Sequence, residues 1–205
     1  GPWVYDGQDH TAGYQVTFDG KAVTADSGSN GLIYTLPTGD KLTLTPAATA
    51  TVKNATDGPV KNDYTYTLEN GETYSNVTPT YGALRVDPRS VEVVVSSGTI
   101  TYDGENHTVS DASGVTEDYT YNKVKATDGG TGVLAADEDT LKSLIAVVYD
   151  SKGVKSASQK DVGSYPASVL NASDNMMGDN YVLSFVNGRM DIITDPTPIT
   201  VKSPS

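Results

Sequence analysis

Short runs in which apolar and polar residues alternate recur along the chain, and clusters of Gly, Asp, Asn and Ser separate them. Alternation with a period of two places the apolar side chains on one face of a β-strand. The main runs lie at residues 3–5, 14–18, 21–24, 32–36, 41–45, 64–68, 82–86, 91–95, 99–101, 119–121, 167–169, 181–185 and 189–193. The pattern predicts a mostly all-β protein made of short strands.

One segment with helical spacing interrupts this pattern. Its apolar residues fall at i, i+3, i+4 and i+7, namely Leu141, Leu144, Ile145 and Val148. Asp137 or Asp139 would cap such a helix. Residues 147–149 fit a strand equally well, so helix and strand both stay open here. Residues 47–53 also fit a helix or a strand, and their β-branched residues favour the strand.

Two dipeptides predict hairpins. Asp19–Gly20 separates the runs 14–18 and 21–24, and Asn187–Gly188 separates 181–185 from 189–193. Both dipeptides are typical of the two-residue turns that join antiparallel strands.

A seven-residue phrase occurs twice. Tyr-Asp-Gly-Gln-Asp-His-Thr spans residues 5–11, and Tyr-Asp-Gly-Glu-Asn-His-Thr spans residues 102–108, which is 97 positions later. The phrases contain the only two histidines of the chain. A repeat at this spacing predicts two tandem mostly-β domains, each with at most one short helix.

The domain boundary is predicted at Asp87–Pro88, because Pro ends strand pairing. Residues 1–88 then form the first repeat and residues 89–205 the second. Gly1–Pro2 is interpreted as the remnant of a cleaved tag.

The C-terminal end repeats the boundary. Asp195–Pro196 matches Asp87–Pro88, and residues 199–201 match the start of the 91–95 run. Residues 196–205 therefore begin a third repeat or form the last strand of the second.

Composition narrows the function classes. The formal net charge is −12 and the lysines are scattered, which argues against nucleic acid and against docking on an anionic membrane. Such acidity keeps a secreted repeat soluble and monomeric. The chain has no Cys, so disulfides and thiolate catalysis are excluded. No apolar stretch is long enough for a membrane span, so no membrane insertion is expected.

The repeated phrases supply the main candidate residues: Tyr5, Asp6, Gly7 and His10, and Tyr102, Asp103, Gly104 and His107. A ligand or a pH switch is one interpretation of the histidines. We favour a structural role, in which His holds the turn by a hydrogen bond. The sequence shows no distinctive set of general base, nucleophile and orienting group, so neither catalytic residues nor a cofactor are expected.

Calcium and a covalent crosslink are the remaining candidates. Asp26 and Asn30 lie in a loop that resembles a calcium loop, but Gly28 stands at its third position and its twelfth position lacks Glu. Asp137 and Asp139 form another acidic stretch. We expect solvated loops at both places and no metal. A Lys–Asn isopeptide bond would require a buried Lys.

Three motifs together resemble a known family. They are the Tyr-Asp-Gly phrase, Asp-Val-Gly-Ser-Tyr at 161–165, and Asn-Tyr-Val-Leu-Ser-Phe-Val-Asn-Gly-Arg-Met-Asp-Ile-Ile at 180–193. They are similar to the YDG and "mostly β-grasp" (MBG-type) tandem repeats of bacterial cell-surface proteins and adhesins. The first unit departs from the pattern, since residues 61–64 lack Gly and Gly82 lacks a preceding Asn.

The resemblance implies that each domain is a small β-grasp-like or Ig-like sandwich. It also implies a non-catalytic stalk or adhesion module, secreted or wall-anchored at a bacterial surface. Its partners would be neighbouring repeats of the same chain, and a host glycan or protein. The alternative is a glycan- or host-protein-binding module that uses exposed Tyr in the loops of the second unit. An accessory domain of an extracellular carbohydrate-active enzyme also fits. An enzyme ranks last.

Overall fold

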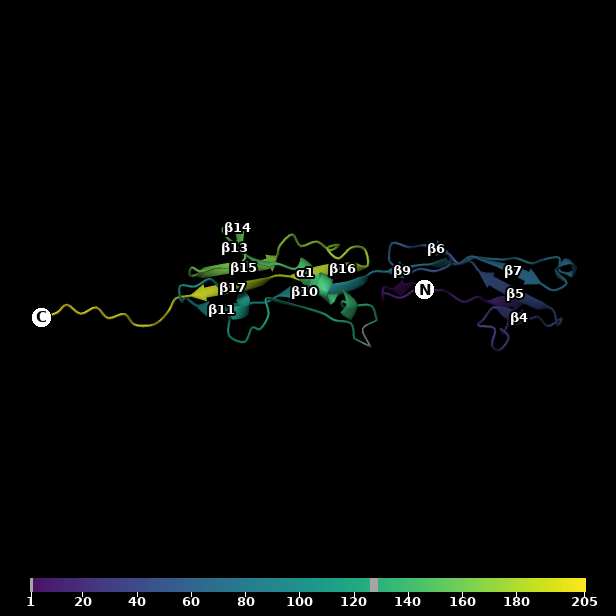
Figure 1. Ribbon diagram of the computed structural model, residues 1–205, viewed down its shortest axis with the longest axis horizontal. Helices are drawn as coiled ribbons and strands as arrows, with labels where there is room; N and C mark the ends of the chain where they lie inside the picture. The colour runs from purple at the N-terminus through teal and green to yellow at the C-terminus, as the bar shows by residue number, and fades with distance from the viewer. Residues whose placement is uncertain (1, 126–128) are drawn as a thin grey trace. The chain divides into compact units, whose positions relative to one another are not determined.

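The computed structural model describes residues 2–125 and 129–205, so Gly1 of the dipeptide interpreted as a tag remnant lies outside the described residues. By its internal contacts the chain divides into two compact units, residues 1–88 (unit 1) and residues 89–205 (unit 2). Short strands dominate both units, which confirms the mostly-β prediction (Figure 1).

Unit 1 contains small antiparallel sheets and one parallel pair. Its strands are β1 (Trp3–Val4), β2 (Val16–Phe18), β3 (Lys21–Val23), β4 (Ile33–Thr35), β5 (Lys41–Pro46), β6 (Val60–Lys61), β7 (Tyr64–Leu68), β8 (Ala83–Leu84) and β9 (Val86–Asp87). A 3-10 turn, η1 (Gly71–Thr73), follows β7. The sheet β4-β5-β7 is antiparallel, as are the pairs β2-β3 and β6-β8, whereas β1 runs parallel to β9.

The predicted hairpin at Asp19–Gly20 is confirmed. Phe18 pairs with Lys21 across the turn, and both turn residues have positive φ, 49° at Asp19 and 69° at Gly20. Two positive φ values in a two-residue loop match the right-handed twist of the flanking strands.

The prediction of a strand or helix over residues 47–53 is wrong. The Ala50 amide donates to the Ala47 carbonyl at 2.9 Å, which closes a turn. Val52 forms an isolated β-bridge with His10, and no residue of the segment belongs to a strand. Ala50 and Val52 are both buried, in a cluster with Leu84 and Val86. The apolar residues of this segment therefore serve the core without forming a ladder.

Unit 2 contains two sheets and one short α-helix. Its strands are β10 (Arg89–Val95), β11 (Gly98–Thr101), β12 (Tyr119–Tyr121), β13 (Val147–Ser151), β14 (Val154–Ser156), β15 (Gly163–Val169), β16 (Tyr181–Val186) and β17 (Gly188–Ile193). Its helical segments are η2 (Val109–Asp111), η3 (Ala135–Asp137) and α1 (Glu138–Leu144). One sheet has the order β12-β10-β16, and the other has the order β11-β17-β15-β13-β14.

The first and last strands of unit 2 lie side by side and change sheets together. β10 runs parallel to β16 in the first sheet, and β11 runs parallel to β17 in the second (Figure 1). The predicted hairpin at Asn187–Gly188 is therefore wrong, because β16 and β17 do not pair with each other. The chain crosses there from one sheet to the other, beside the crossing at Ser96–Ser97.

The helix and the strand proposed near residue 145 are both present, one after the other. Helix α1 ends at Leu144, Ile145 is extended with φ −86° and ψ 118°, and β13 begins at Val147. Leu141 anchors the helix, with a fully buried side chain. Asp137 occupies the N-cap position but makes no side-chain cap bond.

Buried apolar side chains from both sheets fill unit 2. Fully buried side chains include Val91, Val93, Leu141, Tyr149 and Met190. None of the helices in the described residues has the length and apolar character needed to span a membrane.

Candidate functional site

The first repeated phrase folds into a compact turn in unit 1. The Tyr5 amide donates to the Asp87 carbonyl at 2.8 Å, and Gly7 takes a positive φ of 76°. The Asp6 carboxylate closes the turn: its Oδ1 accepts from the Gln8 amide and lies 2.9 Å from His10 Nε2. We call this arrangement the first histidine turn.

The second phrase builds the same arrangement in unit 2, the second histidine turn. The Tyr102 amide donates to the Ile193 carbonyl at 2.8 Å, and Gly104 has φ 88°. Asp103 Oδ1 accepts from the Glu105 amide and lies 2.8 Å from His107 Nε2. The tyrosine amide, the aspartate carboxylate and the glycine of the phrase therefore have the same roles in both units.

The backbone of each histidine also forms hydrogen bonds with a segment that is distant in the sequence. The amides and carbonyls of His10 and Val52 exchange hydrogen bonds at 2.8 and 3.0 Å, and those of His107 and Gln159 do the same at the same distances. The histidine turns thus join the start of each unit to its middle and to its last strand.

The surroundings of the two rings differ. His10 stacks on Trp3, with ring centroids 4.9 Å apart and an interplanar angle of 16°. His107 instead has a second carboxylate, since Nδ1 lies 3.2 Å from Asp111 Oδ2. Asp111 also forms a capping box with Thr108 at the start of η2. The sequence signal for this contact was an Asp four residues after the histidine.

Electrostatics in the second turn favours a cationic ring. Hydrogen bonding to Asp103 raises the pKa of His107 above its ordinary value of 6.5, against a partial burial that lowers it, and Asp111 adds to the rise. His107, and then the Glu105 amide, lower the pKa of Asp103 below 3.8. In unit 1 partial burial opposes ionisation of Asp6, but the bonds from Gln8 and His10 still lower its pKa.

In the first calcium candidate, hydrogen-bond donors of the protein already bind the Asp26 carboxylate. Asp26 accepts from the Thr35 amide at 3.0 Å and from the Thr35 hydroxyl at 2.8 Å, so both carboxylate oxygens have partners. Asn30 has a positive φ of 52° in the same loop. These residues shape the loop before β4.

The two carboxylates of the second calcium candidate also have other surroundings. Asp137 accepts from the Tyr181 hydroxyl at 2.6 Å, and Asp139 lies in the first turn of α1. Over residues 2–125 and 129–205, no group of three or more His, Asp or Glu side chains is placed to hold a metal ion.

An isopeptide crosslink lacks its central requirement. Every Lys of the chain lies in the described part, and each is exposed. A Lys that forms this bond must be buried beside its Asn and a carboxylate, so the crosslink is not supported.

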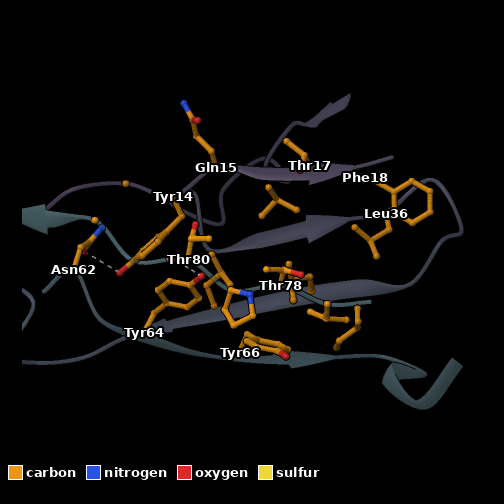
Figure 2. Close-up of a pocket in the computed structure, with 18 of the residues that line it drawn as sticks. Tyr14, Gln15, Thr17, Phe18, Leu36, Asn62, Tyr64, Tyr66, Thr78 and Thr80 are labelled. Carbon is orange, nitrogen blue, oxygen red and sulfur yellow. Dashed lines mark hydrogen bonds between the residues drawn. The ribbon is translucent and has the colours of Figure 1, made fainter. Parts of the chain in front are cut away.

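Unit 1 contains a groove that the sequence did not reveal. Its volume is about 750 Å³, and residues 12–19 and 76–80 line it together with side chains of β5 and β7. Figure 2 shows Tyr14, Tyr64 and Tyr66 along it, with Asn62 toward one end and Phe18 and Leu36 toward the other. The alternation of Tyr64, Tyr66 and Leu68 was the available signal, but alternation alone does not distinguish a core face from an open one.

No family model, no curated protein and no solved structure matches the chain.

Proposed function

We propose that this chain is a non-catalytic stalk or adhesion module of a secreted or wall-anchored bacterial surface protein, made of repeats that carry tension. The observation that carries the proposal is the pairing of the first and last strands of unit 2. β10 pairs with β16 from Arg89↔Tyr181 to Val94↔Val186, and β11 pairs with β17 from Gly98↔Met190 to Thr101↔Ile193.

Parallel neighbours at the two ends of a domain resist stretching. A pull on Arg89 and on Ile193 acts in opposite directions along the two strands, so it loads the hydrogen bonds of both ladders in shear. These bonds must then break together and not one after another. This geometry suits a module that connects two points under load.

The histidine turns support the same role. The bond from the Tyr102 amide to the Ile193 carbonyl extends the β11-β17 ladder by one position, and the bond from Tyr5 to Asp87 does so for β1 and β9. The same turn secures the last strand of each unit, as expected of tandem repeats. The resemblance to YDG-type surface repeats points to the same setting.

Force spectroscopy with two pulling axes tests the proposal. The chain has no Cys, so introduced cysteines define the axis. The pair Ser90→Cys and Thr194→Cys loads the ladders in shear, whereas Ser90→Cys with Asp179→Cys pulls apart strand ends that lie at the same side of β10-β16. All three positions are exposed. We expect unit 2 to resist a several-fold higher force on the first axis. Equal forces on the two axes would contradict a load-bearing role.

A glycan- or host-protein-binding module is the second candidate function. The Tyr-lined groove favours it, although the groove lies in unit 1 and not in the loops of unit 2 where exposed Tyr were expected. Exposed aromatic side chains such as Tyr66 offer flat surfaces on which sugar rings can stack. Saturable binding on a glycan array that Tyr66→Ala abolishes would support this function.

A further inference from the structure

Three tyrosine side chains of unit 1 pack against one another. Tyr14 precedes β2, Tyr64 begins β7, and Tyr81 lies shortly before β8. The ring centroids of Tyr14 and Tyr64 are 5.1 Å apart, and those of Tyr64 and Tyr81 are 4.9 Å apart. Aromatic pairs in proteins pack with their centroids about 4.5–7 Å apart, so both contacts are close. Figure 2 shows the first of these contacts, between Tyr14 and Tyr64.

The orientation of the rings distinguishes the two contacts. Oxidation of a phenol by one electron gives a phenoxyl radical, whose reactive ring carbons are those beside the carbon that carries the oxygen. Two such radicals couple where these edges of the rings meet. Tyr14 and Tyr64 are T-shaped, with ring planes at 67°, so an edge faces a ring plane. Tyr64 and Tyr81 are tilted by 38°, which allows their edges to approach each other.

A hydrogen bond holds the oxygen end of Tyr64 beside Tyr81. The Tyr64 hydroxyl donates to the Thr80 carbonyl at 3.1 Å, and Thr80 is the residue directly before Tyr81. The reactive carbons of Tyr64 flank this hydroxyl, so they lie at the end of the ring that faces the segment of Tyr81. The Tyr14 hydroxyl instead donates to Asn62 Oδ1 at 3.5 Å. Tyr64 and Tyr81 are therefore the pair that is placed for coupling.

Tyr81 is held in position and is also open to solvent. The Lys61 ammonium lies 3.6 Å from the centroid of the Tyr81 ring, and Asp63 pairs with the same ammonium at 2.8 Å. The attraction between a cation and a ring face restrains the ring. Tyr81 is still 43% exposed, so an oxidant in solution can reach it. The pair thus combines a fixed geometry with access from solvent.

We propose that Tyr64 and Tyr81 form an oxidative crosslinking site, at which hydrogen peroxide and a haem peroxidase produce dityrosine. Each phenol loses one electron and one proton, and the two radicals join through a carbon–carbon bond between their rings. The two ring hydrogens at the new bond then move to the phenol oxygens. Overall, two electrons and two protons from the pair reduce one peroxide to two waters. This modification goes beyond the load-bearing role and does not depend on it.

The crosslink would connect β7 to the segment before β8. Between β7 and Tyr81 lie η1 and residues 74–80, which contain no strand. A covalent bond between Tyr64 and Tyr81 closes this stretch into a loop and lowers the conformational entropy of the unfolded chain. Unit 1 should therefore become more stable when the crosslink forms.

Peroxide treatment of the full chain tests the site. The chain is treated with hydrogen peroxide and a haem peroxidase at low protein concentration, and the monomer is isolated by size-exclusion chromatography. We expect the intact mass to fall by two hydrogen atoms, and dityrosine fluorescence to appear at a longer wavelength than that of Tyr or Trp. Cleavage after Glu69 and Glu72 places Tyr64 and Tyr81 in separate peptides, which should remain joined. Fragmentation of the joined peptides identifies the two coupled tyrosines.

The stability of the crosslinked monomer gives a second readout. Trp3, the single tryptophan, lies in unit 1, so the midpoint of its fluorescence change reports the melting of that unit. We expect this melting temperature to rise by about 5 °C or more after crosslinking.

Three substitutions locate the site. Tyr81→Phe and Tyr64→Phe each keep the ring and remove the phenol, so the fold persists while the crosslinked monomer is lost. Tyr66→Phe is the matched control, because Tyr66 lies on the same strand as Tyr64 and is 38% exposed but does not belong to the cluster. This variant should yield as much crosslinked monomer as the unchanged chain.

Several results would overturn the proposal. They are an absence of crosslinked monomer, oxidation that gives only crosslinks between different molecules, a crosslink that maps to other tyrosines, or one that persists in Tyr81→Phe. A crosslinked monomer that melts no higher than the untreated chain would contradict the stabilising effect. None of these outcomes depends on the force measurement.

Discussion

Gly188 lies directly against the carbonyl oxygen of Ser96, at a distance that leaves no room for a β-carbon. The two residues mark the points at which β10–β11 and β16–β17 pass from one sheet to the other. A side chain at position 188 would have to displace backbone and not a flexible side chain. The close packing of the two sheets of unit 2 therefore depends on this glycine.

Gly188→Ala should destabilise unit 2 by about 3 kcal/mol or more, because an added methyl group forces the two crossing strands apart. Urea denaturation followed by far-UV circular dichroism measures the change. Gly82→Ala is the matched control, since its β-carbon would lie in open space, and it should stay within about 1 kcal/mol of the unchanged chain. Equal effects of the two substitutions would contradict the assigned crossing.

Tyr149→Phe should cost unit 2 about 1–3 kcal/mol, because it leaves a buried donor without a partner. The Val109 amide donates to the Tyr149 hydroxyl at 2.7 Å, and both residues are fully buried. Tyr102→Phe changes a side chain that is 38% exposed and should have almost no effect. Chemical denaturation of both variants measures the difference in the free energy of unfolding. An unchanged free energy for Tyr149→Phe would indicate that water reaches the Val109 amide.

The second histidine turn predicts a defined pH dependence for unit 2. The folded pKa of His107 is raised above 6.5, so its stabilising contribution is complete below pH 6.5 and is lost as the pH rises through the folded value. The pKa of Asp103 is lowered below 3.8, so its contribution is present above that pH and is lost as the pH falls through the folded value. The pair therefore stabilises unit 2 most between these limits.

Melting temperatures measured from pH 4 to pH 9 check this dependence. His107→Gln should remove the loss of stability above pH 6.5 and lower the melting temperature most near pH 5–6, where the ring is cationic. Asp111→Asn should reduce the loss only in part, because Asp103 remains. An unchanged pH profile for His107→Gln would show that the ring is not charged in the folded state.

Removing divalent cations should leave the melting curve unchanged. Both oxygens of Asp26 already accept from Thr35, and Asp137 accepts from Tyr181. Replacing these bonds by calcium would cost the donors their partners. Thermal melts with EDTA and with excess calcium make the comparison. A melting temperature that falls on chelation would reveal a calcium site that includes these residues.

Local strand signals were predictable from the sequence, whereas pairing was not. Alternation found most strands, and Asp19–Gly20 formed the expected hairpin because its neighbours had no competing partners. Asn187–Gly188 is an equally suitable turn dipeptide, but β16 pairs with β10, and β17 pairs with β11 and β15. A dipeptide indicates only whether a tight turn is locally favourable. It carries no information on the distant strands that pair with its neighbours.

The contacts at the candidate sites also divide into local ones, which the sequence indicates, and long-range ones, which it does not. The contact between Asp6 and His10 lies within one phrase, so a hydrogen bond that holds this turn could be predicted from the sequence, although its partner was not. The groove joins β2, β5, β7 and residues 76–80, which only the tertiary structure brings together. The alternation over residues 64–68 predicted the strand, but it does not show whether the face that carries Tyr64 and Tyr66 is covered.

The pairing of β10 with β16 also governs when unit 2 can form. Arg89 is the first residue of the unit to enter a ladder, and its partner Tyr181 is among the last to be synthesised. During synthesis β10 can pair with β12 early, but its other edge stays unpaired until β16 is made, and β17, an interior strand of the second sheet, is made last of all. Such long sequence separation slows folding and favours an all-or-none transition. A chain that stops before Tyr181 would lose β16 from one sheet and β17 from the other, so such a truncation should yield an unfolded unit and not a smaller folded one.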